Sequence, residues 1–194
     1  MPKSKTYSIA EIFGPTIQFE GSMSGTIASF VRFSGCNKKC KFCDTDHAET
    51  KTLSGAEILV TLNSIGCKDV ILTGGEPLLQ VDTELLELIK NDYRIHLETN
   101  GSIELGMLKQ SFYHVVCSPK QKISQTRIEE ADDLKILYPA YTERFISDYK
   151  NGFKHKHLFL QAEAGKIETK NLIPIAEKFN ARISHQTHKL VGLP

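Results

Sequence analysis

The chain has 194 residues, a length that suits one domain with a sizeable apolar core. Its 24 Lys and Arg residues nearly balance its 23 Asp and Glu residues, so the net charge of +1 gives no general reason to bind nucleic acid or an anionic membrane. No stretch reaches the roughly 18 apolar residues of a membrane span, and the first residues lack the apolar core of a secretory signal. We therefore expect a single domain over residues 1–194, in a cytoplasmic protein with no nucleic-acid or membrane partner.

Short apolar runs alternate with amphipathic stretches along the chain, and they predict strands and helices respectively. Ser54 and Glu57 have the spacing of a capping box, Gly66 is a plausible stop for the helix that follows, and Pro174 suits a first helical turn. The charged region 139–156 fits either a helix or a loop excursion. In chain order the predicted elements are strand Ile27–Phe33, a helix from Ser54 to Gly66, strand Val70–Thr73, helix Asp82–Lys90, and strands Ile95–Thr99, His114–Ser118, Leu134–Tyr138 and Leu158–Gln161, then helix Glu168–Phe179.

This alternation of strands and helices predicts an α/β fold with a parallel sheet and right-handed crossovers. About six strands are too few to close an eight-stranded barrel. We therefore expect either an open partial barrel or a doubly wound sheet. In both, functional loops gather at the carboxyl ends of the strands, and the polar motifs described next each follow a predicted strand.

Three of the five cysteines lie within eight residues, directly after the first predicted strand. They are Cys36, Cys40 and Cys43. An odd count with one tight cluster argues against a disulfide framework and is typical of metal binding. Structural zinc and a fully ligated iron–sulfur cluster both take four protein ligands, so three thiolates suggest a cubane cluster with one iron open to a small molecule. The alternative is a zinc site completed by Asp44, His47 or Cys67.

A glycine motif, Thr73-Gly74-Gly75-Glu76-Pro77, ends the next predicted strand. Two glycines let the backbone approach a ligand closely, and the Glu76 carboxylate could accept hydrogen bonds from an ammonium group. A tight strand-to-helix turn would use the same residues. The motif follows the cysteine triplet by about thirty residues.

Together, the C-x3-C-x2-C spacing, the aromatic residue before the last cysteine and the Gly-Gly-Glu motif resemble the radical S-adenosylmethionine (SAM) superfamily. The resemblance implies a single-domain, open β/α barrel of the radical SAM type. It also implies a 4Fe–4S cluster on Cys36, Cys40 and Cys43, with SAM bound to the open iron. Phe42 would pack near the adenine and Glu76 would hold the methionine amino group, while reductive cleavage of SAM supplies a 5′-deoxyadenosyl radical.

Further segments resemble one family, the 7-carboxy-7-deazaguanine synthases of queuosine and 7-deazapurine biosynthesis. They are EIFGPTIQFEG from Glu11, FVRFSGCN from Phe30, CDT from Cys43, ETNG from Glu98, SPK from Ser118, and QTHK with a following Gly and Pro from Gln186. The resemblance spans nearly the whole chain. The chain departs from the pattern at Phe19, which stands where the family has a glycine, and a phenylalanine does not take a positive φ cheaply.

The family resemblance implies a lyase that converts 6-carboxy-5,6,7,8-tetrahydropterin to 7-carboxy-7-deazaguanine by ring contraction with loss of ammonia. Independently of the resemblance, the guanidinium group of Arg32 is suited to bidentate binding of a carboxylate. The implied substrate-binding residues are Ile17, Gln18, Phe19, Glu20, Arg32, Thr73, His188 and the terminal Pro194. Those implied for SAM are Phe42, Cys43, Asp44, Gly75, Glu76, Ser118, Pro119, Lys120, Gln161, Ala162, Glu163 and Ala164, and Thr45 is implied for Mg²⁺.

The same resemblance implies two partners, a flavodoxin- or ferredoxin-type reductant and a second copy of the chain in a homodimer. Two other functions remain open. A glycyl-radical-type activating enzyme would share the cysteine spacing but act on a protein, and it would have no use for the N-terminal Gln-x-Glu-Gly segment. A zinc or iron–sulfur binding module, such as an electron carrier, would need a fourth ligand and no Gly-Gly-Glu motif.

Overall fold

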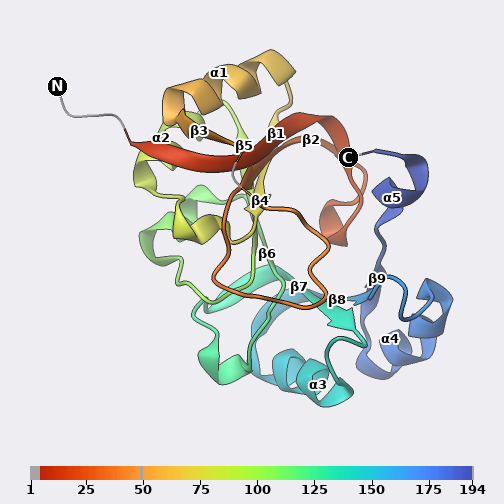
Figure 1. Ribbon diagram of the computed structural model, residues 1–194. Helices are drawn as coiled ribbons and strands as arrows, with labels where there is room; N and C mark the ends of the chain where they lie inside the picture. Colours follow the sequence, from red (N-terminus) through yellow and green to blue (C-terminus); the bar gives the residue numbers. More distant parts are fainter. Residues whose placement is uncertain (1–4, 49, 194) are drawn as a thin grey trace.

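The computed structural model describes residues 5–48 and 50–193, and in them nine strands form one curved sheet (Figure 1). The sheet order is β3-β1-β2-β4-β5-β6-β7-β8-β9. Strands β2 and β4 to β9 are parallel, whereas β1 is antiparallel to both β2 and β3. The strands are β1 Thr6–Gln18, β2 Thr26–Phe33, β3 Lys51–Ser54, β4 Asp69–Gly74, β5 Arg94–Thr99, β6 His114–Cys117, β7 Glu130–Tyr138, β8 Lys154–Ala162 and β9 Arg182–Ser184.

The predicted open β/α barrel is confirmed, with seven parallel strands instead of about six. Strands β1, β3 and β9 were not predicted. In β1, Gly14 and Pro15 interrupt the alternation, and the pairing with β2 shifts register between Phe13 and Thr16. Strands β3 and β9 have only 4 and 3 residues, too few for a period-2 pattern to stand out.

The helices follow their predicted signals closely. Ser54 and Glu57 form the capping box of α1, Gly66 ends it with a φ of 81°, and the Asp82 side chain caps α2. The predicted helix Glu168–Phe179 is a 3-10 turn followed by α4, and the ambiguous region 139–156 contains α3. The helices are α1 Gly55–Ile65, α2 Thr83–Ile89, α3 Glu143–Gly152, α4 Ile173–Phe179 and α5 Thr187–Val191, with 3-10 turns η1 Gly21–Met23, η2 Pro77–Leu79, η3 Gly106–Ser111, η4 Ile123–Gln125 and η5 Thr169–Leu172.

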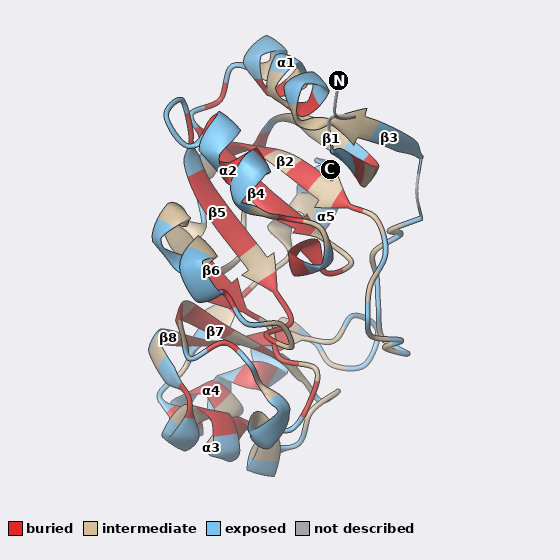
Figure 2. Cartoon of the chain, turned by 90° about the vertical axis from the view of Figure 1, so that its left-hand side faces the viewer, coloured by how far each residue is buried: buried red, intermediate tan, exposed pale blue. Residues whose placement is uncertain are grey.

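Side chains alternate across the parallel strands, so the sheet has two different faces. One face contributes apolar residues such as Val31, Leu72 and Leu97 to the core beneath the helices. Burial is concentrated on the strands and on the inner sides of the helices (Figure 2). The other face carries polar residues, including Arg32 and Thr73, into a pocket. No helix in the described part of the chain has the length and apolarity to span a membrane.

Candidate active site

A pocket of about 960 Å³ opens at the carboxyl ends of the parallel strands. Thr73, Ser118 and Gln161, at or just after the ends of β4, β6 and β8, all line it. A long loop between β2 and β3, residues 34–48, forms another wall, and we call it the cysteine loop. The volume is at the upper end of the usual range for ligand pockets, which leaves room for a cofactor and a small substrate together.

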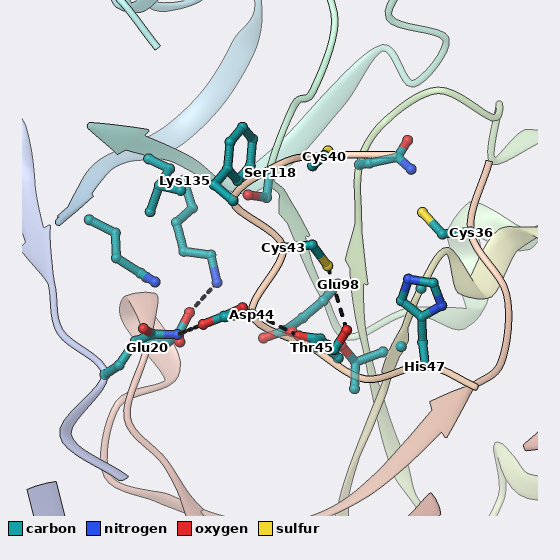
Figure 3. Close-up of a pocket in the computed structure, with 18 of the residues that line it drawn as sticks. Glu20, Cys36, Cys40, Cys43, Asp44, Thr45, His47, Glu98, Ser118 and Lys135 are labelled. Carbon is teal, nitrogen blue, oxygen red and sulfur yellow. Dashed lines mark hydrogen bonds and ion pairs between the residues drawn. The ribbon is translucent and has the colours of Figure 1, made fainter. Parts of the chain in front are cut away.

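Cys36, Cys40 and Cys43 line this pocket as free thiols (Figure 3). Cys67 and Cys117 are buried elsewhere, so Cys67 does not lie where it could complete a zinc site on the loop. Among residues 5–48 and 50–193, no three His, Cys, Asp or Glu side chains are close enough to hold one metal ion. A cubane cluster takes each thiolate on a different iron, so three sulfur donors spread along one loop fit it with one iron left open.

A half-buried cation, Lys120, lies beside the cysteine loop. The Nζ of Lys120 donates to the Ser118 hydroxyl at 2.7 Å and lies 6.0 Å from the centroid of the Phe42 ring. Burial lowers the pKa of Lys120, and the positive charge of Lys135 lowers it further. Burial raises the pKa of the Cys40 thiol, and the charge of Lys120 opposes that rise. Lys120 therefore offsets part of the negative charge that thiolates bring to this wall.

The two glycines of the Gly-Gly-Glu motif allow an unusually close approach to the base of the cysteine loop. A Cβ on Gly74 would lie 2.1 Å from the carbonyl oxygen of Phe33, and one on Gly75 would lie 2.0 Å from that of Gly35. The Gly75 site is also within 2.9 Å of the Cβ of Cys36. The protein's own backbone thus requires both glycines, whatever ligand binds beside them.

Glu76 is completely buried and does not line the pocket. Its carboxylate accepts hydrogen bonds from the Thr99 hydroxyl at 2.8 Å, the Asn100 amide at 2.8 Å and the Leu78 amide at 3.2 Å. Burial raises its pKa, and these hydrogen bonds hold back the rise. The Asn100 side chain in turn donates to Asn37 of the cysteine loop at 3.0 Å. Glu76 therefore ties the ends of β4 and β5 together behind the pocket wall.

A network of hydrogen-bonded and charged side chains lines another side of the pocket. The Glu98 carboxylate accepts from the Gln18 amide at 2.9 Å through one oxygen and from the Thr73 hydroxyl at 2.9 Å through the other. Beside it, Lys135 forms an ion pair with Glu20. Residues from four strands or strand ends, β1, β4, β5 and β7, thus meet at one polar surface.

Arg32 of β2 is held against an aromatic pair at the edge of the pocket. Its Nε donates to the Glu11 carboxylate at 2.6 Å, and its guanidinium carbon lies 5.7 Å from the centroid of the Phe13 ring. The Phe13 and Phe30 rings are stacked, with centroids 5.0 Å apart. These contacts fix the plane of a guanidinium group that suits bidentate binding of a carboxylate.

The segment that carries α5 closes a further side of the pocket. Asp44 of the cysteine loop accepts hydrogen bonds from Gln186 at 3.1 Å and from Lys189 at 2.5 Å. Burial alone would raise the pKa of Asp44, but these partners outweigh burial and lower it. The adjacent Thr45 hydroxyl also contacts Asp44, at 3.4 Å. The C-terminal segment and the cysteine loop are therefore joined by charge-assisted hydrogen bonds.

Comparison with known proteins places this site in a family. Residues 30–111 match the sequence profile of the Radical SAM superfamily. The 7-carboxy-7-deazaguanine synthase of Bacteroides thetaiotaomicron is 36% identical, over 95% of this chain and 97% of that protein. The chain belongs to the 7-carboxy-7-deazaguanine synthase family. The Haemophilus influenzae protein of the same name is 32% identical, over 96% of this chain and 94% of its own length. Among solved structures, the crystal structure of QueE from Escherichia coli matches with a TM-score of 0.72 and 25% sequence identity. That match covers 94% of this chain and 95% of the other.

The family confirms the predicted fold class and enzyme class, and two of the predicted cofactors, the 4Fe–4S cluster and S-adenosylmethionine. A 7-carboxy-7-deazaguanine synthase is a radical SAM enzyme, so the chain uses a 4Fe–4S cluster and S-adenosylmethionine. Neither the activating enzyme nor the zinc or iron–sulfur module is favoured by these similarities.

Most residues predicted for the site meet in the one pocket. Lining it are Ile17, Gln18, Glu20, Arg32, Cys36, Cys40, Phe42, Cys43, Asp44, Thr45, Thr73, Gly75, Ser118, Lys120, Gln161, Ala162, Glu163, Ala164 and His188. Phe19, Glu76 and Pro119 are not in the lining, and Pro194 lies outside the described residues. Phe19 is half-buried and Pro119 is buried, so both sit beside pocket residues without forming the wall.

Several charged residues of the pocket were not predicted as site residues, and three of them, Glu11, Glu98 and Lys135, lie on strands of the sheet. Glu98 and Lys135 lie inside the predicted apolar strands Ile95–Thr99 and Leu134–Tyr138. A charged residue inside an apolar strand could have identified both as pocket residues. Side chains alternate between the two faces of a strand, so a charged one is expected on the face away from the apolar core. Glu11 lies in the strand that was missed altogether.

Proposed function

We propose that the chain converts 6-carboxy-5,6,7,8-tetrahydropterin to 7-carboxy-7-deazaguanine with release of ammonia. The observation that carries the proposal is near-full-length similarity to proteins named for that product. The pocket supports it, since free thiols lie along one wall and donors and acceptors for a polar heterocycle along another. A product of this kind suits queuosine or another 7-deazapurine as the end of the pathway.

On the thiol side, Cys36, Cys40 and Cys43 would ligate the cluster and leave one iron for SAM. The bound cluster and SAM supply the radical that abstracts a hydrogen atom from C6 of the substrate. The protein's own part is to bind and orient SAM. We assign that part to Phe42, Cys43, Asp44, Gly75, Ser118, Lys120 and Gln161–Ala164, with Glu76 and Pro119 supporting the wall from behind.

On the polar side, each substrate group has a matching residue. Arg32 would bind the 6-carboxylate through its guanidinium group. Gln18 and Glu20 would bind the amino and N–H edge of the pterin ring, with Thr73 and His188 beside them. Ile17 precedes this segment and Phe19 lies within it, and we assign Pro194 to the same substrate.

Thr45 would bind Mg²⁺ together with the substrate carboxylate and water. Magnesium commonly takes only one or two protein ligands and completes its octahedron with substrate and water, so a single hydroxyl at the pocket wall is compatible with this role.

Two macromolecular partners belong to the same proposal, in a cytoplasmic setting. The exposed Lys39 and Lys41 on the cysteine loop would attract an acidic flavodoxin- or ferredoxin-type reductant to the cluster side. The exposed Leu190 and Val191 of α5 would be covered in a homodimer.

The test is anaerobic turnover of cluster-reconstituted protein with SAM, a low-potential reductant, Mg²⁺ and the carboxytetrahydropterin. We expect 7-carboxy-7-deazaguanine in the mass spectrum of the products. Formation of 5′-deoxyadenosine without that product would keep the radical chemistry and reject this substrate. In that case an activating enzyme that acts on a protein partner would become the favoured function.

A further inference from the structure

Lys135 is a lysine in the middle of a buried strand that points into the active-site pocket. It lies on β7, between the core residues Leu134 and Ile136, and its ammonium group reaches the Glu20 carboxylate across the pocket (Figure 3). The side chains of Lys135 and Glu20 are each 13% exposed. A lysine in such a place is costly unless a partner compensates its charge, so the Glu20 contact is the reason that it can be there.

The charges around Lys135 keep it protonated. Burial alone would lower its pKa, but the carboxylates of Glu20, Glu98 and Asp44 outweigh burial and raise the pKa above its ordinary value. The nearby Lys120 is the opposite case, since its pKa is lowered. Lys135 is therefore a fixed positive charge, and not a group that exchanges a proton with a substrate near neutral pH.

Glu20 depends on this charge. Burial acts to raise the pKa of Glu20, and the ion pair with Lys135, a hydrogen bond from Gln186 and the charge of His188 together bring it below its ordinary value. The Glu20 backbone amide also donates to the Gln18 side chain at 2.9 Å, and Gln18 in turn donates to Glu98. Lys135 and Gln186 thus hold the carboxylate, and Gln18 fixes the backbone that carries it.

A fixed, ionised carboxylate at this point has a specific use. The pyrimidine edge of a pterin presents an N–H and an exocyclic amino group side by side, and a carboxylate accepts from both. A neutral carboxylic acid would offer a donor where an acceptor is needed. We propose that Lys135 is a positioning residue that holds the Glu20 carboxylate, charged and oriented, for the amino-substituted edge of the substrate ring.

The inference rests on the proposed function, and its test separates the two. The variant is Lys135→Met, and the matched control is Lys178→Met, which removes a lysine paired with Glu143 on the surface. Holoenzyme of each would be assayed for the KM of the carboxytetrahydropterin, the kcat, the Kd of SAM and thermal unfolding. A substrate analogue lacking the 2-amino group would be assayed in parallel.

We expect Lys135→Met to raise the substrate KM about 10- to 100-fold, the range for a hydrogen bond to a charged group, with the Kd of SAM within about twofold of wild type. It should also lose most of the preference for the substrate over the analogue, because Glu20 is then no longer held as a charged, oriented acceptor for the amino group. Lys178→Met should change none of these. Lys135→Arg, which keeps the charge, should keep the preference.

A double-mutant cycle tests whether Lys135 acts through Glu20. Glu20→Gln should raise KM and reduce the preference on its own, and adding Lys135→Met should then have little further effect. Unchanged KM and preference in Lys135→Met, or additive effects in the double variant, would overturn the inference. If Lys135→Met does not fold, Glu20→Gln alone still tests the inference. A Glu20→Gln enzyme that prefers the substrate over the analogue as strongly as wild type does would overturn it. Absence of product from wild type would reject the proposed function instead.

Discussion

Gly75→Ala gives a sharp test of the contact between the Gly-Gly-Glu motif and the cysteine loop. The new Cβ would meet the Gly35 carbonyl oxygen at 2.0 Å, a backbone atom that no side-chain rotation can remove. The two segments are also joined by hydrogen bonds from the Gly75 amide to Phe33 at 3.1 Å and from the Glu76 amide to Gly35 at 3.0 Å. Separating the segments would sacrifice both hydrogen bonds.

The magnitude follows from these terms. Two backbone hydrogen bonds contribute about 1 kcal/mol each, and overpacking a tight contact costs about 1–3 kcal/mol, so the free energy of unfolding should fall by about 3–5 kcal/mol. Gly66→Ala is the matched control. Gly66 has a φ of 81° with open space around it, so alanine there should cost only the about 1–2 kcal/mol of backbone strain.

Urea unfolding of the apoproteins measures this difference, and iron and sulfide analysis after reconstitution measures its effect on the cluster. Gly75→Ala should retain less iron than Gly66→Ala, because moving Gly35 moves the adjacent Cys36. Equal unfolding free energies in the two variants, with equal iron, would refute the reasoning. It would mean that the loop moves aside without loss, and that the close approach does not position the thiols.

Three further predictions concern other parts of the chain. Cys36→Ala should abolish iron retention and turnover, whereas Cys67→Ala, outside the pocket, should keep both. Lys189→Met breaks a half-exposed ion pair with Asp44, so urea unfolding should shift by less than about 1 kcal/mol while the KM of SAM rises. Burial lowers the pKa of His96 below its ordinary value of 6.5, although the hydrogen bond and charge of Asp69 act to raise it. As the pH falls, His96 therefore becomes protonated in the unfolded chain before it does in the folded protein. The unfolding free energy should therefore decrease below about pH 6.5, by at most about 1.4 kcal/mol per pH unit, and His96→Gln should flatten that slope between pH 7.5 and 5.5.

The sequence was most informative where a local pattern determines a local structure. The Ser54–Glu57 capping box and the Gly66 stop set both ends of α1, and dense β-branched runs marked six of the seven parallel strands. Strand β1 was missed because its conformation depends on pairing with β2 and β3 on either side. Its own residues, broken by Gly14 and Pro15, do not carry the signal.

The site divides in the same way. The three cysteines and the Gly-Gly-Glu motif are contiguous in sequence, so their spacing could be recognised without the fold. The polar side is assembled from single residues of separate strands, such as Thr73 and Glu98, and only the sheet order brings them together. Lys135 is the clearest case, since its partner Glu20 is 115 positions away.

Glu76 and Lys135 show why chemistry read from a residue type still needs the three-dimensional context. Glu76 is predicted to hold the methionine amino group of SAM, and in the structure its carboxylate accepts hydrogen bonds from Thr99, Asn100 and Leu78 within the wall. Lys135 was read as part of an apolar strand, yet it supplies a buried positive charge to the pocket. In both cases the decisive fact is where the side chain points, into the wall from the turn after β4 for Glu76 and into the pocket from β7 for Lys135. A carboxylate turned into the wall fixes the position of loops, whereas a lysine turned into the pocket fixes the charge of its neighbours.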